Sequence, residues 1–231
     1  MPTAAKRQYV NFAFYKVDPA WRRLSKEERE ASIKEFSAAV GEWRHSMLLI
    51  SYSTVGLRAE TDFMLWRIGD SLELFQGMTR QLNSTSLGAY LTTPYSFVAM
   101  TKRSIYVDKH VHSGQEGRRA QIIPGEHRYL FVYPFVKTRD WFLLPIEKRQ
   151  EMMNVHIEIG HRFPSVKLNT TYSFGLDDQE FVVAFETDQP ADFLDLVMAL
   201  RETEGSRFTL RDTPIFTCVR KTIQEALDDL G

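Results

Sequence analysis

Cysteine is nearly absent from this sequence, since Cys218 is the only one among 231 residues. A single cysteine cannot form an internal disulfide, nor can it supply the several thiolates that structural zinc and iron–sulfur sites use. Cys218 lies in the apolar run 214–219, a pattern typical of a buried strand. We therefore interpret it as a core residue.

An excess of either charge and a long apolar segment are also missing. Lys and Arg number 29 against 30 Asp and Glu, so the formal net charge is −1. That balance argues against a nucleic-acid-binding surface, which depends on concentrated positive charge. No apolar run approaches the roughly 20 residues of a membrane-spanning helix, and no apolar signal segment follows the N-terminus. We expect a cytoplasmic protein without a membrane span.

The motifs of several common enzyme classes do not occur. The sequence contains no Gly-x-Gly-x-x-Gly, no Walker loop, no Gly-x-Ser-x-Gly and no His-Glu-x-x-His. What it has in quantity is aromatic residues, namely 16 Phe, 9 Tyr and 4 Trp. These indicate a well-filled core or an aromatic-lined pocket, and composition does not choose between them.

One arrangement of strands and helices occurs twice along the chain. In the first half we expect strands at 8–16, 47–55, 62–68 and 95–101, and helices at 25–43 and 71–89. In the second half we expect strands at 129–136, 166–174, 181–187 and 213–220, and helices at 145–162 and 191–201. Each half reads β-α-β-β-α-β, the order of a ferredoxin-like unit. We predict an α+β fold with one unit in 1–103 and a second in 128–231.

The connecting stretch 104–127 is the least regular part of the chain. It carries three of the six histidines, His110, His112 and His127, and the basic pair Arg118 and Arg119. Connections of this length inside compact domains are usually functional or disordered. Composition leaves two interpretations open, a functional flap and a plain linker.

His156 is the most informative single residue. On the helix expected at 145–162 it shares an apolar stripe with Met152 and Met153 before it and Ile159 and Gly160 after it. A neutral imidazole on a rigid helix, beside a glycine that leaves room, suits an iron ligand. The alternative is a core histidine that hydrogen-bonds to the backbone, and the pattern alone does not separate the two.

Tyr133 and Lys137 lie on a strand with a strict alternation. Tyr133 shares one strand face with Phe131 and Phe135, and Lys137 lies two residues further on the same face. These two polar groups could point into one cavity. The alternatives are a core tyrosine and a solvated lysine at a strand end.

Three segments together resemble the chlorite dismutase superfamily, most closely its coproheme decarboxylase branch. They are residues 141–145 (Trp-Phe-Leu-Leu-Pro), the helical His156 with Glu158 and Gly160, and the turn 175–178 (Gly-Leu-Asp-Asp). The resemblance covers most of the chain and is densest from 129 to 219. It implies two ferredoxin-like units per chain, assembled into a homopentamer, with iron-coproporphyrin III (coproheme) or haem b in the second unit.

The resemblance also implies roles for individual residues. His156 becomes the axial iron ligand, and Glu204 matches a carboxylate that hydrogen-bonds the outer nitrogen of that ligand. Further positions that it implies at the cofactor are Lys137, Trp141, Leu168 and Ser206, with Arg119 matched through a gapped loop.

Two positions favour the decarboxylase branch over true chlorite dismutases. Leu168 stands where the dismutases carry a distal arginine, and Tyr133 stands in the Tyr-Pro-Phe segment that resembles the decarboxylases. The implied reaction is hydrogen-peroxide-dependent conversion of coproheme to haem b. Tyr133 would form the radical, Lys137 would assist the propionate and His110 would act as distal base. His112 is the alternative to His110.

Two other functions stay open. Leu168 in place of a polar group favours a haem carrier or sensor without turnover, and decomposition of chlorite is the weaker option because the distal arginine is missing. Coproheme, hydrogen peroxide and other copies of this chain are the expected partners, and ferrochelatase is a further candidate.

Overall fold

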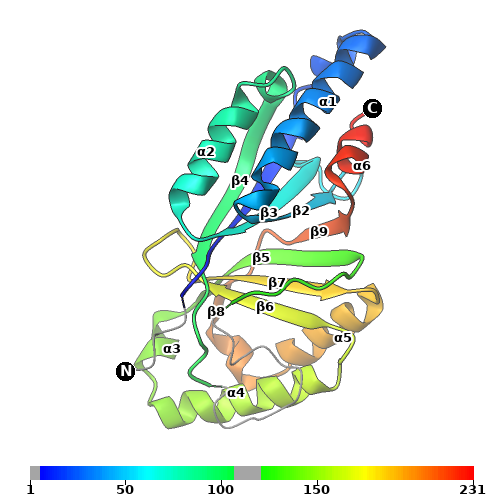
Figure 1. Ribbon diagram of the computed structural model, residues 1–231. Coiled ribbons are helices and arrows are strands. Elements are labelled where there is room, and N and C mark those ends of the chain that lie inside the picture. Colours follow the sequence, from blue (N-terminus) through cyan, green and yellow to red (C-terminus); the bar gives the residue numbers. More distant parts are fainter. Residues whose placement is uncertain (1–5, 107–120) are drawn as a thin grey trace. The chain divides into compact units, whose positions relative to one another are not determined.

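The computed structural model describes residues 6–106 and 121–231 (Figure 1). The chain folds as two compact units. We call residues 8–99 with 216–231 the N-terminal unit, and the described residues of 100–215, together with residues 6 and 7, the C-terminal unit. His110, His112 and Arg119, which were predicted at the site, lie outside the described residues.

The N-terminal unit has the predicted β-α-β-β-α-β order. Its elements are β1 (Tyr9–Val17), α1 (Lys26–Glu42), β2 (Leu48–Ser53), β3 (Phe63–Gly69), α2 (Leu72–Asn83), β4 (Leu91–Met100), β9 (Phe216–Arg220) and α6 (Ile223–Asp228). The strand order is β4-β1-β3-β2-β9, and the helices cover one face of this sheet (Figure 1). Ser25 caps α1 in a capping box with Glu28, which fixes where the helix begins.

Side chains fill the helix-facing core of the N-terminal unit. Trp21, Phe36, Phe63 and Met78 are fully buried there, and Tyr15 stacks on Phe63 with the ring centroids 4.8 Å apart. Burying a side chain of this size stabilises the fold by about 1.5–3 kcal/mol. Since aromatic rings fill this interior, the helix-facing side of the N-terminal sheet is a packed hydrophobic core.

The last strand differs from the sequence-based expectation, which assigned 213–220 to the second unit. In the structure β9 pairs with β2, with Tyr52 opposite Arg220 and Ser53 opposite Val219. Phe216 of β9 stacks on Phe14 with the ring centroids 4.0 Å apart. A repeated element order does not specify which strand the last one pairs with, and Phe216 and Cys218 are fully buried in the position that β9 takes. Burial raises the pKa of the Cys218 thiol, as suits a core residue.

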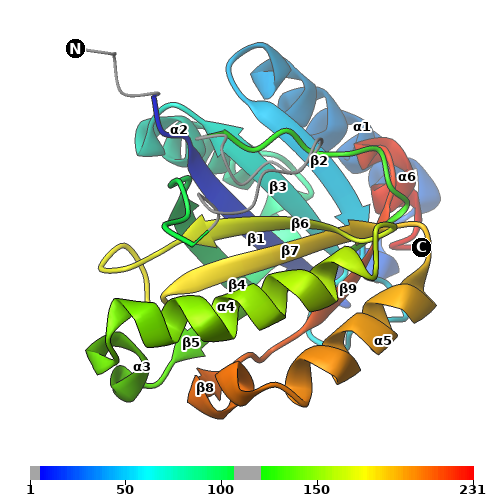
Figure 2. The same cartoon turned by 90° about the horizontal axis from the view of Figure 1, so that it is seen from below.

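The C-terminal unit repeats the strand and helix order of the N-terminal unit, except that a different strand takes the last position. Its elements are β5 (Tyr129–Lys137), α3 (Arg139–Leu143), α4 (Ile146–His161), β6 (Lys167–Tyr172), β7 (Phe181–Thr187), α5 (Pro190–Arg201), the 3₁₀ helix η5 (Glu204–Phe208) and β8 (Thr209–Arg211). The strand order is β6-β7-β5-β8, so the short β8 occupies the edge expected for the last strand. Helices α4 and α5 lie on one face of this sheet (Figure 2).

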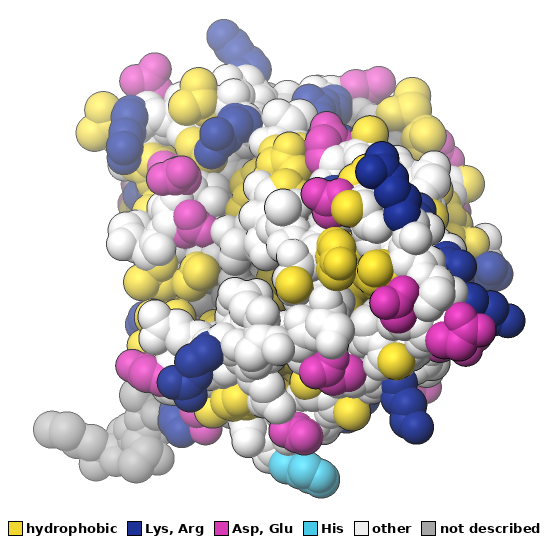
Figure 3. Space-filling model, turned by 90° about the horizontal axis from the view of Figure 1, so that it is seen from above, with side chains coloured by type: hydrophobic (Ala, Val, Ile, Leu, Met, Phe, Trp, Pro, Cys, Tyr) yellow, Lys and Arg dark blue, Asp and Glu magenta, His cyan; other side chains and the backbone are white. Residues whose placement is uncertain are grey.

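The surface agrees with the near-zero net charge. Figure 3 shows basic and acidic side chains interspersed over the face that it draws. Among the described helices, none is long and apolar enough to cross a membrane.

Candidate functional site

Helix α4 buries far fewer of its residues than the corresponding helix of the N-terminal unit. The 17-residue α1 buries Ser32, Ile33, Phe36, Ala39 and Val40. The 16-residue α4 buries Met152 and Ile159. The two helices have the same place in their repeats, so the comparison identifies the helix-facing side of the C-terminal sheet as the candidate site.

Three neighbouring strands of the C-terminal sheet have side chains on this helix-facing side, at positions that are paired across the strands. The paired residues form three rows across β6, β7 and β5: Leu168–Phe185–Phe131, Thr170–Val183–Tyr133 and Tyr172–Phe181–Phe135. On β5 and β7 the rows are covered, since Tyr133 is 8% exposed and Phe185 is 6% exposed. On β6 they are open, since Leu168 is 41% exposed and Thr170 is exposed. The β6 end of the first two rows is therefore accessible from outside the protein.

His156 lies half-buried on α4, between the buried Met152 and Ile159 on the same stripe. A Cβ atom added at Gly160, one turn further on, would meet no atom within 4 Å. Burial lowers the pKa of His156 to about 4, and the neighbouring charge of Lys137 contributes. The imidazole is therefore neutral near pH 7, which is the form that binds a metal ion.

Lys137 reaches the same region from the end of β5. A β-bulge between Val136 and Lys137 interrupts the alternation there. The Lys137 ammonium donates to the Gly205 carbonyl oxygen at 3.0 Å and lies 4.2 Å from the ring centroid of the buried Trp141. Burial lowers the pKa of Lys137 to about 8, against the opposing effect of Glu180. The site thus holds a partly desolvated cation, which suits a carboxylate ligand.

The lowered pKa of Lys137 predicts a stability effect. Below pH 8 the folded protein holds Lys137 charged and partly desolvated, which lowers the free energy of unfolding. This destabilisation disappears as pH rises from about 8 toward 10.5, because the folded state then loses the proton before the unfolded state does. Lys137→Met retains most of the aliphatic stem and removes the charge, so it should raise Tm at pH 7 by about 2–4 °C. The gain should shrink by pH 10. Circular dichroism melts at both pH values test this, with the exposed Lys148→Met as the control. A Tm that falls at pH 7 would contradict the prediction.

Tyr133 projects from β5 into the apolar cluster beneath α4 and α5. Its ring stacks on Phe185 with the centroids 6.0 Å apart, and Ile159 of α4 belongs to the same cluster. Burial raises the pKa of the phenol, and the carboxylate of Asp212 adds to the effect while Arg201 opposes it. The hydroxyl therefore keeps its hydrogen throughout the physiological pH range.

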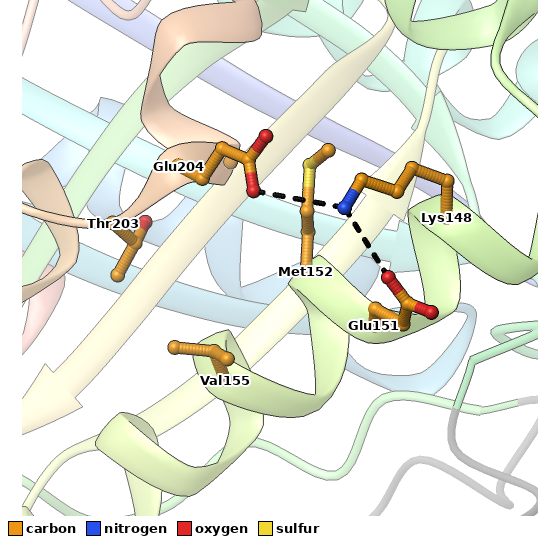
Figure 4. Close-up of a pocket in the computed structure, with 7 residues that line it drawn as sticks. Lys148, Glu151, Met152, Val155, Thr203 and Glu204 are labelled. Atoms are coloured by element: carbon orange, nitrogen blue, oxygen red, sulfur yellow. Dashed lines mark hydrogen bonds and ion pairs between the residues drawn. The ribbon is translucent and has the colours of Figure 1, made fainter.

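Two other predicted site residues, Ser206 and Glu204, interact with residues of this same chain. The Ser206 hydroxyl lies 2.7 Å from the carbonyl oxygens of both Arg201 and Thr203, so it can donate to either. The Glu204 carboxylate is exposed and lies 4.0 Å from the Lys148 ammonium, at a pocket of about 120 Å³ between α4 and η5 (Figure 4). Among the described residues no hydrogen bond joins Glu204 to His156. In this structure the carboxylate pairs with a cation at the rim.

Sequence reasoning missed two residues that border the site. Tyr106 lies edge-on to Trp141 with the ring centroids 6.4 Å apart, and its carbonyl oxygen accepts a hydrogen bond from Gln150 on α4. Thr170 lies in the row of Tyr133. The period-2 pattern of β6 could have revealed Thr170, because it is two residues from Leu168. Tyr106 lies in irregular chain, where no periodic signal exists.

The residues present fit an iron porphyrin. The described residues hold no group of three or more His, Cys, Asp or Glu side chains that could bind a metal ion. A porphyrin supplies its own nitrogen ligands, so one neutral imidazole is sufficient. His156 offers that imidazole. The exposed Leu168 on β6 offers apolar surface, and Lys137 offers a cation for a propionate.

Comparison with known proteins finds similarity over nearly the whole chain. The chlorite dismutase family model matches residues 6–221. A coproheme decarboxylase from Mycolicibacterium smegmatis is 30% identical over 226 residues, which is 96% of this chain and 94% of that protein.

Solved structures agree with the sequence comparison. Chlorite dismutase from Candidatus Nitrospira defluvii in complex with imidazole superposes with a TM-score of 0.86 at 28% identity, covering 96% of this chain and 94% of that one. A putative chlorite dismutase superposes with a TM-score of 0.80 at 22% identity, covering 97% of this chain and 100% of that one, and supports the fold alone.

Proposed function

This chain belongs to the chlorite dismutase family, and we propose that it is a coproheme decarboxylase that uses hydrogen peroxide to convert iron-coproporphyrin III to haem b. The observation that carries the proposal is Tyr133. It is a buried, protonated phenol on the sheet face that packs under α4, the helix of His156. The relative named a coproheme decarboxylase supports the same assignment.

Binding follows from the chemistry of three side chains. His156 would hold the iron, because its imidazole is neutral at working pH and α4 is a rigid support. Lys137 would hold a propionate, because a partly desolvated ammonium strengthens a charge-assisted hydrogen bond. Trp141, buried against Lys137, keeps that ammonium in place.

Tyr133 has the properties of a hydrogen-atom relay. When bound, the iron porphyrin supplies the redox chemistry with peroxide. The Tyr133 phenol, which keeps its O–H because burial raises its pKa, can lose that hydrogen atom and then take one from a propionate side chain. Each propionate loses one carbon dioxide and two hydrogen atoms to become a vinyl group, while one hydrogen peroxide is reduced to two water molecules.

Three substrates separate the proposed function from its alternatives. Purified protein is incubated with ferric coproheme and peroxide, with haem b and peroxide, and, once loaded with haem b, with chlorite. Mass spectrometry follows the porphyrins and an oxygen electrode follows chlorite. We expect haem b from coproheme. Rapid oxygen release from chlorite without decarboxylation would overturn the proposal.

A haem carrier or sensor is the second candidate, and Leu168 favours it. This exposed apolar residue on β6 offers no hydrogen bond to a reacting molecule. A carrier would bind coproheme or haem b tightly and form no product with peroxide. The coproheme incubation distinguishes the two functions.

We also propose that the chain forms a closed ring of identical copies, expected to be a pentamer. Edge strands of a sheet with unpaired backbone groups are commonly covered by assembly, and closed symmetry is the usual result. Light scattering coupled to size-exclusion chromatography should give a mass of about five chains at micromolar concentration. A monomer over that concentration range would refute the assembly.

A further inference from the structure

Polar atoms are scarce on the sheet face that packs under α4. Among the nine side chains of the three rows, hydroxyl groups occur on Tyr133, Thr170 and Tyr172. Tyr133 is buried, and Tyr172 hydrogen-bonds to Ser104. In the described part of the chain the Thr170 hydroxyl has no hydrogen-bond partner, and this residue is exposed. Of the hydroxyl-bearing residues in these rows, Thr170 is therefore the exposed one.

The register of the sheet fixes where that hydroxyl lies. Thr170 pairs with Val183, and Val183 pairs with Tyr133, so the three residues form one row. Neighbouring strands are about 4.8 Å apart, which places the backbones of Thr170 and Tyr133 roughly 10 Å from each other. The two hydroxyl-bearing residues flank Val183, and the neighbouring positions on the same face are apolar at Leu168 and Phe185.

We propose that Thr170 donates a hydrogen bond to the small molecule that binds iron on the side facing the sheet. This inference rests on the proposed function, because it requires an iron porphyrin held by His156. If His156 held the iron, a small molecule bound on the other side of the porphyrin would meet this sheet face, where Thr170 is the exposed residue with a hydroxyl. A threonine hydroxyl has one donor and two acceptor positions, so it can hold a peroxide molecule.

The neutral hydroxyl also favours one class of substrate. A charged donor such as arginine stabilises an anion far more than a neutral hydroxyl does. Leu168, Val183 and Phe185 add no charge to this face. If iron porphyrin bound at His156, this uncharged sheet face would suit hydrogen peroxide, which is neutral, better than the chlorite anion.

The test measures fluoride binding to protein loaded with ferric haem b. Bound fluoride accepts hydrogen bonds and donates none, so its affinity reports a nearby donor. Thr170→Val keeps the shape and removes the hydroxyl, and it should raise the fluoride Kd about five- to tenfold. Thr170→Ser keeps a hydroxyl and should stay within about twofold of wild type. The control Thr92→Val changes an exposed strand threonine of the N-terminal unit and should leave the Kd unchanged.

The readouts separate this inference from the proposed function. An unchanged fluoride Kd in Thr170→Val, with an unaltered Soret band, overturns the role of Thr170 and leaves decarboxylation intact. Absence of haem b from wild type and coproheme overturns decarboxylation, while the fluoride comparison stays valid. A threonine does not titrate, so the ratio of the two Kd values should be constant from pH 6 to 8. A ratio that changes near the usual histidine pKa assigns the donor to a histidine and overturns the inference.

Discussion

Tyr133→Phe should abolish formation of haem b from coproheme and peroxide while leaving coproheme binding intact. The substitution preserves the ring that stacks on Phe185 and removes only the phenolic O–H. A phenyl ring has no weakly bound hydrogen to give up, so we expect the rate to fall by at least about two orders of magnitude. Stopped-flow spectroscopy and mass spectrometry measure the loss.

The control for this variant is Tyr129→Phe on the same strand. Tyr129 is partly buried and contacts Arg128 at the far end of β5, four residues from Tyr133. Its loss of a hydroxyl should leave turnover within about twofold of wild type. Haem b formed at the wild-type rate by Tyr133→Phe would exclude Tyr133 as the reacting phenol.

His156→Ala should weaken binding of ferric coproheme by at least about 100-fold and shift the Soret band. Of the other histidines that the structure describes, His45 ends the 3₁₀ helix Trp43–His45 of the N-terminal unit, and His127 hydrogen-bonds to Asp188. His161 lies five residues further along α4, away from the stripe of Met152 and Ile159. None of the three lies on the stripe of His156. Spectrophotometric titration measures the affinity.

Added imidazole distinguishes a lost ligand from a damaged fold. Removing the His156 ring leaves space for a free imidazole, which should restore part of the Soret band in His156→Ala and have little effect on wild type. A variant with the wild-type spectrum and affinity would reduce His156 to a packing residue, and the assignment of the haem site would fail with it.

The elements that sequence predicted well are those with local signals. Ser25 and Glu28 mark the beginning of α1 with a capping box, and β7 was predicted with the bounds that the structure has, 181–187. A capping box and a short run of apolar, β-branched residues are sufficient for such elements, because both signals depend on neighbours in the sequence.

Pairing between distant segments was not predictable in the same way. The apolar pattern around Phe216 identifies a strand, and it does not specify that this strand pairs with β2. Strand β8, with three residues, is too short to show periodicity. The bulge before Lys137 also has no signature in the alternation around it.

The candidate site also combines residues that have a local signal in the sequence with contacts between distant segments. His156 and Tyr133 were predicted as site residues because each lies on an apolar stripe of a regular element, and their roles stay predictions. The partner of Glu204 was not, because the ion pair with Lys148 joins η5 to α4. The row that Thr170 shares with Tyr133 depends on the register of three strands, which only the folded sheet defines.

The central claim, that this chain decarboxylates coproheme at the His156 site, is tested most directly by the stoichiometry of the reaction. The wild-type complex with ferric coproheme is titrated with hydrogen peroxide, and mass spectrometry counts the carboxyl groups lost. Because each propionate requires one peroxide, the account predicts two peroxide molecules per haem b, with a product lacking one carboxyl group at intermediate additions. Peroxide consumed without loss of carbon dioxide, or with breakdown of the porphyrin alone, would contradict it.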